Sequence, residues 1–269
     1  MSSLYGQMVW PENWEKEMKV ALGIDIGGSG IKGALVDTKR GEMVTDRYRI
    51  PTPRPATPDA VIAVVEKIRG HFNYEGPIGV GFPGIVIDGV TYSAVNIHPD
   101  WYKFNARKHI AKATGCDVIV GNDADVAGYA EMRFGAGKKA KGEVMIFTLG
   151  TGIGSSMFVK HACVPNLEMG HLYLPGHEVD AELYASDRIR KEEKLSWKKW
   201  GKRLDEYFQH IEFLFSPQLI IIGGGVIKHH DKFLKYIKTN AQVVPAKLLN
   251  EAGIIGAAAA AANGGDCSL

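Results

Sequence analysis

Cysteine is scarce in this chain of 269 residues. The three cysteines, Cys116, Cys163 and Cys267, stand far apart and form no C-x-x-C pair. Metal sites and disulfide frameworks both require cysteines in clusters or at characteristic spacings. The sequence therefore predicts neither a zinc site nor a disulfide framework, and it fits the reduced environment of the cytoplasm.

An excess of charge of one sign and long apolar runs are missing as well. Lys and Arg number 32 and Asp and Glu number 30, so the net charge is +2, too mild to indicate a nucleic-acid partner. No apolar run approaches the ~20 residues that span a bilayer, and the first residues lack the pattern of a secretory signal. We expect no nucleic acid, no membrane and a cytoplasmic location.

Glycine, by contrast, is abundant, with 32 residues and no repeat period. The first glycine-rich stretch separates two apolar runs at 21–26 and 31–36, a pattern that predicts strand, turn and strand. Glycine lets the backbone turn with positive φ and lets main-chain N–H groups approach an anion. We interpret this stretch as a phosphate-binding hairpin that consists of Gly27, Gly28, Ser29, Gly30 and Lys32.

Other phosphate loops fit this stretch less well. Gly28, Gly30 and Gly33 satisfy G-x-G-x-x-G, but a dinucleotide fingerprint requires a helix directly afterwards, and here a second apolar run follows. The P-loop pattern G-x-x-x-x-G-K-[ST] does not occur in the sequence. A plain tight hairpin remains an alternative, although such a hairpin needs only one or two glycines.

The same plan recurs later in the chain. The apolar run 144–149 leads into a second glycine turn and a returning strand at 157–159, and the run 219–222 leads into a third glycine turn. The residues of these turns are Gly150, Thr151, Gly152 and Gly154, then Gly223, Gly224 and Gly225. The repetition predicts an α/β protein whose duplicated halves face each other across a cleft.

Asp123 is the strongest catalytic candidate. It follows a predicted strand at 117–120 and precedes a predicted helix that begins at Ala124. Ligands of α/β sheets bind where strands end, and phosphoryl transfer to a hydroxyl group uses a base near the attacking oxygen. The alternative is that Asp123 is an ordinary N-cap of the helix.

Taken in order, the motifs resemble the ROK family of sugar kinases over residues 20–262. The resemblance rests on the first hairpin after GID at 23–25, NDA at 122–124, LGTGIG at 149–154, EMGH at 168–171 and IGGG at 222–225. It implies the two-domain actin-like ATPase (ribonuclease H-like) fold. It also implies a small domain of residues 1–134, onto which a C-terminal helix at 250–263 packs, and a large domain of residues 135–249.

The same resemblance implies roles for individual residues. Asp123 is the catalytic residue, and Asp25 lies near Mg²⁺, bound through water. The glycine turns hold the phosphates of the donor, and the partner protein is a second copy of the chain, giving a homodimer. The positions that match the family's sugar contacts are Asn96, Asn122, Asp123, Glu168, His171 and Glu182.

Four further segments are similar to the polyphosphate-using glucokinases of this family: PTPRPATP at 51–58, ASDRIR at 185–190, LSW at 195–197 and LFSP at 214–217. Many family members carry a zinc-binding cysteine cluster after the EMGH-like motif, whereas none follows His171 here. The resemblance implies transfer of a phosphoryl group from polyphosphate, and also from ATP, to the 6-hydroxyl of glucose, with mannose as a further candidate substrate.

Three alternatives remain open. The first is a strictly ATP-dependent hexose kinase, either a glucokinase or a mannokinase. The second is a non-catalytic, sugar-sensing regulator, although fewer than 20 residues precede the first predicted strand, too few for a helix-turn-helix domain. The third is an actin-like ATPase or chaperone, against which the sugar-contact set argues.

A basic segment lies at 188–203. It contains eight Lys and Arg residues and two Glu residues, a charge of +6 in a chain of net charge +2. Lys191, Lys194, Lys198 and Lys202 recur at the spacing of one helical face. We expect this face to guide polyphosphate, and the alternative is a solvated helix surface.

Overall fold

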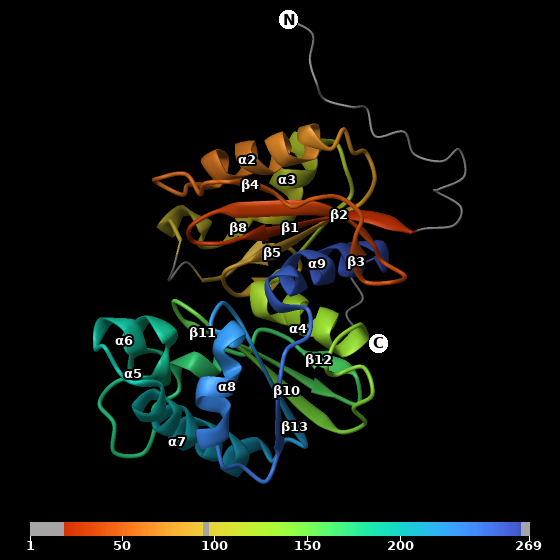
Figure 1. Cartoon of the computed structure of the whole chain (residues 1–269). Helices are drawn as coiled ribbons and strands as arrows, with labels where there is room; N and C mark the ends of the chain where they lie inside the picture. Colours follow the sequence, from red (N-terminus) through yellow and green to blue (C-terminus); the bar gives the residue numbers. More distant parts are fainter. Residues whose placement is uncertain (1–18, 94–96, 265–269) are drawn as a thin grey trace, which may run out of the picture.

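The computed structural model describes residues 19–93 and 97–264. Two β-sheets lie one above the other with helices between them and on both outer faces (Figure 1). The first sheet has the strand order β3-β2-β1-β5-β9, with β4 paired to β2. Its strands are β1 (Val20–Ile26), β2 (Ile31–Asp37), β3 (Glu42–Met43), β4 (Tyr48–Ile50), β5 (Ile78–Phe82) and β9 (Val118–Asn122).

The second sheet repeats the plan of the first. In each sheet an antiparallel hairpin pairs through its first strand with a parallel strand from later in the chain, β1 with β5 and β10 with β13. The strand order is β12-β11-β10-β13-β14. The strands are β10 (Glu143–Leu149), β11 (Ile153–Val159), β12 (Ala162–Val164), β13 (Leu219–Gly223) and β14 (Gln242–Pro245). A small third sheet contains β6 (Val86–Ile87), β7 (Val90–Thr91) and β8 (Phe104–Asn105).

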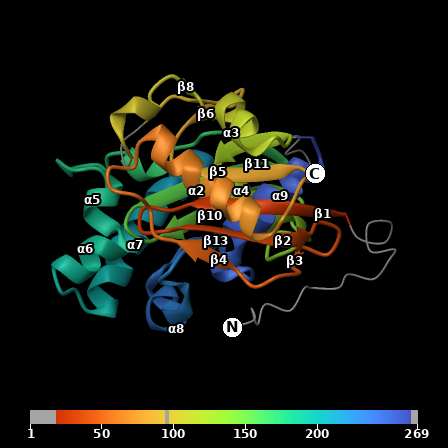
Figure 2. The same ribbon diagram turned by 90° about the horizontal axis from the view of Figure 1, so that it is seen from above.

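The helices form three layers around the two large sheets. Figure 2 shows α2 (Pro58–His71) and α3 (Ala106–Thr114) above the first sheet. Between the sheets lie α4 (Asp123–Arg133) and α9 (Ala252–Ala262). The second sheet carries α5 (Ala181–Ala185), α6 (Asp187–Glu192), α7 (Trp197–Phe215) and α8 (His230–Phe233). Single 3-10 turns lie at Pro99–Trp101, Met169–His171, Ile227–His229, Leu234–Tyr236 and Leu249–Glu251.

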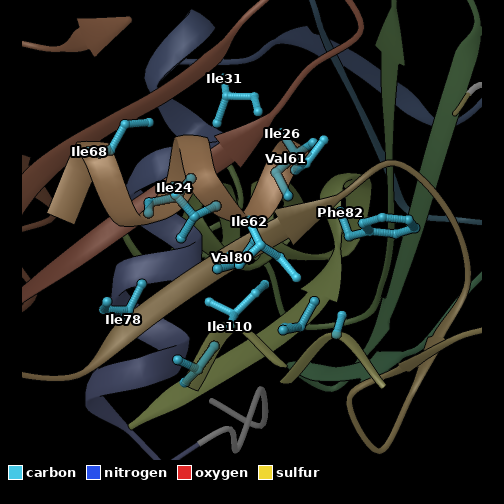
Figure 3. Close-up of a cluster of buried hydrophobic side chains, with 14 of the residues drawn as sticks. Ile24, Ile26, Ile31, Val61, Ile62, Ile68, Ile78, Val80, Phe82 and Ile110 are labelled. Carbon is cyan, nitrogen blue, oxygen red and sulfur yellow. The ribbon is translucent and has the colours of Figure 1, made fainter. Parts of the chain in front are cut away.

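Successive side chains of a strand point to opposite faces of the sheet, and this alternation explains how the layers pack together. On β13, Ile220 and Ile222 pack into the cluster formed with α7, while Ile221 packs into the cluster formed with α4. Both faces of this strand are therefore buried, as a parallel strand between helices requires. Above the first sheet, isoleucines and valines of β1, β2 and β5 pack against Val61, Ile62 and Ile68 of α2 (Figure 3).

The C-terminal helix α9 approaches its neighbours unusually closely because glycines line the contact. A methyl group at Gly79 of β5 would lie 1.8 Å from the backbone oxygen of Ala257, and one at Gly256 would lie 1.7 Å from that of Val126 in α4. No side chain fits at such distances. Gly79 and Gly256 therefore let α9 pack directly against the first sheet and against α4 at Val126, within one turn of Asp123.

Two local predictions were wrong. The helix expected to begin at Ala124 begins at Asp123, one residue earlier. The basic segment 188–203 is not one helix, because α6 ends at Glu192 and Lys194 adopts φ +52° before Ser196 caps α7. A left-handed residue interrupts helical periodicity, so the lysines expected on one helical face are divided between two helices and the turn that joins them.

Candidate active site

The first hairpin has the predicted form. Strands β1 and β2 pair in register from Val20 with Asp37 to Ile26 with Ile31, which leaves residues 27–30 as the turn. Within the turn, the Gly27 N–H donates to the Gly30 carbonyl over 3.2 Å. At its base, the Lys32 ammonium lies 3.2 Å from the Asp25 carboxylate. The hairpin thus holds one cation and one acid beside a short turn of small residues.

The second and third turns lie together on the other sheet. The Gly150 N–H donates to the Gly152 carbonyl over 3.0 Å, closing the second turn. Gly224 has φ +84°, and a methyl group there would lie 2.4 Å from the backbone oxygen of Leu149, so the third turn packs against the start of the second. Small-ligand sites commonly have volumes of about 300–1,000 Å³, and the cavity beside these turns measures about 550 Å³. Its lining includes Gly150, Thr151, Gly225, Arg188, Arg190 and Lys228.

Asn122 and Asp123 have divided roles at the start of α4. The Asn122 side-chain oxygen accepts hydrogen bonds from the N–H groups of Ala124 (2.9 Å) and Asp125 (3.0 Å), so Asn122 is the N-cap. The Asn122 amide also donates to the Gly84 carbonyl over 3.2 Å. Asn122 rather than Asp123 is therefore the N-cap, and the Asp123 carboxylate accepts from the Ala124 N–H as well.

The environment of Asp123 favours its neutral form. Burial, followed by the negative charge of Asp25, raises the pKa of Asp123 to about 7. A carboxyl group with a pKa near neutral pH suits a general base, since it is ionised in part and still binds a proton well. The second hairpin reaches this point too, because the Cβ position of Gly154 lies 3.2 Å from the Cβ of Ala124.

The three predicted sugar contacts beyond α4 are close enough to influence one another. The pKa of Glu168 is raised by burial, lowered by His171 and raised by Glu182. The Glu182 carboxylate accepts from the Ile153 N–H over 2.9 Å, next to the second turn. A carboxylate pair and an imidazole form a cluster of acceptors and donors of the kind that clamps vicinal hydroxyl groups.

Sequence reasoning missed the residues that hold this cluster. Asp180 lies 3.0 Å from His171 Nδ1, and its hydrogen bond is the main cause that raises the pKa of His171. Asp125 accepts from the Asn166 N–H over 2.7 Å, and Asn166 exchanges hydrogen bonds of 2.9 and 3.0 Å with the backbone of Val86. Ser155 bridges the Leu167 carbonyl and the Met169 N–H. These contacts fix the segment that carries Glu168 and His171, and sequence separations of 9 to 80 residues concealed them.

Asn96 and Asp25 are the remaining predicted site residues. Asn96 lies outside the described residues, so its expected sugar contact stays a prediction. Asp25 offers carboxylate oxygens, the ligand type that Mg²⁺ prefers, and it lies close enough to Asp123 to raise that group's pKa. Within residues 19–93 and 97–264 no three His, Cys, Asp or Glu side chains form a metal-holding group, and the water-mediated Mg²⁺ at Asp25 stays a prediction.

Purified protein is expected to contain no stoichiometric zinc. No cysteine cluster follows His171, and the three cysteines of the chain are scattered, whereas structural zinc requires four protein ligands in tetrahedral geometry. Elemental analysis after dialysis against a chelator measures this directly. One tightly held zinc ion per chain would contradict the prediction.

Comparisons with known proteins identify the family of the chain. The profile of the ROK family matches residues 21–181. A polyphosphate glucokinase of Mycobacterium tuberculosis is 42% identical over 240 residues, which are 89% of this chain and 90% of that protein. A polyphosphate glucokinase of Mycobacterium leprae is 40% identical over 89% of this chain and 74% of its own length.

Comparison with solved structures identifies the fold. The inorganic polyphosphate/ATP-glucomannokinase of Arthrobacter sp. strain KM superposes with a TM-score of 0.87 and 45% identity, covering 91% of this chain and 99% of that one. A ROK glucokinase of Streptomyces griseus, solved with glucose and AMPPNP, gives a TM-score of 0.78 at 24% identity over 91% of this chain and 99% of that one. The predicted two-domain actin-like ATPase fold is thus confirmed, and the chain belongs to the ROK family.

Proposed function

We propose that this protein transfers a phosphoryl group from inorganic polyphosphate, and from ATP, to the 6-hydroxyl of glucose. The observation that carries the proposal is the position of Asp123 at the end of a parallel strand. Its carboxyl group has a raised pKa and lies close enough to Glu168 to be influenced by that charge. Gly154 of the second hairpin lies beside the next residue, Ala124. The relatives above, named as polyphosphate glucokinases, support the choice of substrates.

Each group has one task in this proposal. Asp123 accepts the proton of the 6-hydroxyl as its oxygen attacks the terminal phosphorus, and the bond from this phosphorus to the bridging oxygen breaks, which releases ADP or a polyphosphate shorter by one unit. Glu168, His171, Glu182 and Asn122 bind the remaining hydroxyls, with Asp180 orienting His171. The amides of the glycine turns and the Lys32 ammonium hold the donor phosphates. Mg²⁺, near Asp25, neutralises phosphate charge when it is bound.

The proposal also covers the division of the chain into domains, its oligomeric state, its location and its use of mannose. We assign residues 1–134 and the helix at 250–263 to the small domain and residues 135–249 to the large one, because the glycine turns then face the cleft from both domains. A homodimer, a cytoplasmic location and the use of mannose remain predictions. The described residues include no helix that is long and apolar enough to cross a membrane.

The decisive experiment measures glucose 6-phosphate in a coupled assay, with polyphosphate and ATP as donors in parallel. We expect product with both. Product with ATP alone would leave the strictly ATP-dependent hexose kinase. Glucose binding without turnover would favour a sugar-sensing regulator, which a DNA-shift assay would test, and phosphate release that glucose does not stimulate would favour an ATPase.

The basic segment 188–203 gives a prediction about the donor. Half of its cations are already paired, Arg188, Arg190 and Lys191 with acids of α6 and Arg203 with Glu193. Exposed lysines that form no salt bridge within the described part of the chain remain at the turn and on α7, among them Lys194 and Lys198. Because polyphosphate offers only a line of charge, we expect Lys194→Glu with Lys198→Glu to raise the KM for polyphosphate roughly tenfold, and less for ATP, with a larger effect at low salt.

Lys112→Glu on α3 is the matched control, since this exposed lysine lies on the outer face of the other half. It should change neither KM. Equal losses with both donors, or none with either, would contradict a role of these lysines in guiding polyphosphate.

A further inference from the structure

Strand β4 and the segment that follows it lie against the first phosphate-binding turn, and side chains from both donate to its backbone. Thr52 Oγ1 donates to the Gly27 carbonyl over 2.5 Å. Arg54 Nη2 donates to the Gly28 carbonyl over 3.0 Å, and Arg49 Nη2 donates to the Ser29 carbonyl over 2.6 Å. Three consecutive carbonyl groups of the turn are thus held from one short segment by three side chains.

These contacts fix the direction of the carbonyl groups of the turn, and peptide geometry then fixes the direction of its N–H groups. In a planar trans peptide the carbonyl of one residue and the N–H of the next point in opposite directions. If the carbonyls of Gly27, Gly28 and Ser29 face the 49–54 segment, the N–H groups of Gly28, Ser29 and Gly30 face away from it. Within the described residues, no hydrogen bond forms from these three N–H groups.

The two arginines have no other evident structural task. Neither Arg49 nor Arg54 lies within 4.0 Å of a carboxylate in the described part of the chain, and both are exposed. Arg49 also lies directly opposite Lys32 in the β2–β4 pairing, and like charges at opposed positions of a sheet are destabilising. Gly30 accommodates Arg49, because a methyl group there would lie 2.4 Å from its Nε.

We propose that Thr52, Arg54 and Arg49 are positioning residues that hold the first glycine turn with the N–H groups of Gly28, Ser29 and Gly30 directed at the donor phosphate. The inference rests on the proposed function, and it assigns to the PTPRPATP segment a task in that reaction. The three side chains act through the turn and do not themselves touch the transferred group. Both donors present their reacting phosphate to this same turn.

Thr52→Val and Thr52→Ser form the sharpest pair of variants. Valine keeps the shape but cannot donate, whereas serine keeps the hydroxyl. Misplaced catalytic donors lower rates by one to two orders of magnitude, so we expect Thr52→Val and Arg54→Gln to lower kcat about tenfold with polyphosphate and with ATP alike. The KM for glucose should stay unchanged, and Thr52→Ser should retain most of the activity. Arg47→Gln is the control, since Arg47 is exposed directly before β4 and, among the described residues, donates no hydrogen bond to the turn.

A loss confined to polyphosphate would mean that the arginines bind that donor directly and would overturn the positioning role. Variants with lower thermal stability but unchanged kinetics would show that the contacts have only a structural role, and this result would also overturn the positioning role. A second readout does not depend on turnover: in NMR spectra, tripolyphosphate should shift the amide signals of Gly28, Ser29 and Gly30 in the unmodified protein and much less in Thr52→Val.

The two proposals fail in different ways. Absence of turnover in the unmodified protein, with the amide shifts present and dependent on Thr52, would remove the kinase reaction and keep the orientation of the turn. Turnover in the unmodified protein, with variants that match it in kcat and in amide shifts, would remove only the positioning role.

Discussion

Asp123→Asn is expected to lower kcat for phosphoryl transfer by roughly 10²–10⁴ with either donor while leaving the fold intact. Asparagine keeps the size of the side chain and can begin a helix, but it cannot accept the proton of the 6-hydroxyl. The fold should survive because Asn122, and not Asp123, caps α4. The coupled assay measures the loss, and circular dichroism checks the fold.

The raised pKa adds a pH dependence with a definite sign. Since the pKa of Asp123 is about 7 in the folded protein against the ordinary value of 3.8, the folded state binds this proton more tightly than the unfolded chain. The stability that it contributes is complete below about pH 4 and is lost as the pH rises through 7. Activity runs the other way, because the base must be ionised, so kcat should rise as the pH passes 7.

Asp123→Asn should therefore be more stable than the unmodified protein at pH 8 and equally stable at pH 4. Because Asp123 is only partly buried, solvent screening reduces the effect, and we expect a gain of about 1–2 kcal/mol, less than the full pKa difference implies. Asp59→Asn is the matched control, since Asp59 is an exposed acid in the first turn of α2. Near-normal turnover of Asp123→Asn would contradict the assignment of Asp123 as the base.

The parts of the structure that the sequence predicted are those with local signals. Glycine turns between apolar runs indicated the hairpins at 27–30 and 150–152, and an acid after a buried strand indicated Asp123. Each depends on residues adjacent in the chain. The ordered set of these motifs then indicated the fold, because no single motif is specific enough.

The parts that the sequence did not predict depend on contacts between distant residues or on single backbone angles. Nothing near Asp180 indicates that it would meet His171, and Asn166 reaches Val86 across 80 residues. The helical face of lysines failed for another reason. Periodicity predicts that a pattern continues, whereas one residue, Lys194 at φ +52°, ends it, and lysine gives no sign that it will adopt this conformation.

The second prediction with a large expected effect concerns the stability of the region where the chain crosses between the two sheets. It crosses once after α4, at 134–142, and returns before α9, at 246–251. Glu131, which is 1% exposed, joins the two crossings. Its carboxylate accepts from the N–H groups of Ala136 (2.8 Å), Lys247 (3.2 Å) and Leu248 (2.7 Å).

Glu131→Ala should leave these three N–H groups without an acceptor. An unsatisfied buried donor is destabilising by about 1–3 kcal/mol, and relaxation of the exposed ends of both crossings offsets part of the sum. We expect a loss of roughly 3 kcal/mol, seen as a lower Tm by on the order of 6–12 °C for a protein of this size. Thermal unfolding followed by circular dichroism measures it.

Glu131→Gln separates hydrogen bonding from packing. Glutamine fills the same space, but its NH₂ group must face at least one backbone N–H, since both carboxylate oxygens of Glu131 accept such groups. Its Tm should therefore fall by a comparable amount, although no cavity forms. Glu66→Ala on the exposed side of α2 is the control and should stay within about 0.5 kcal/mol. A Glu131→Gln protein as stable as the unmodified one would show that packing alone holds the crossings, and that the carboxylate does not join them.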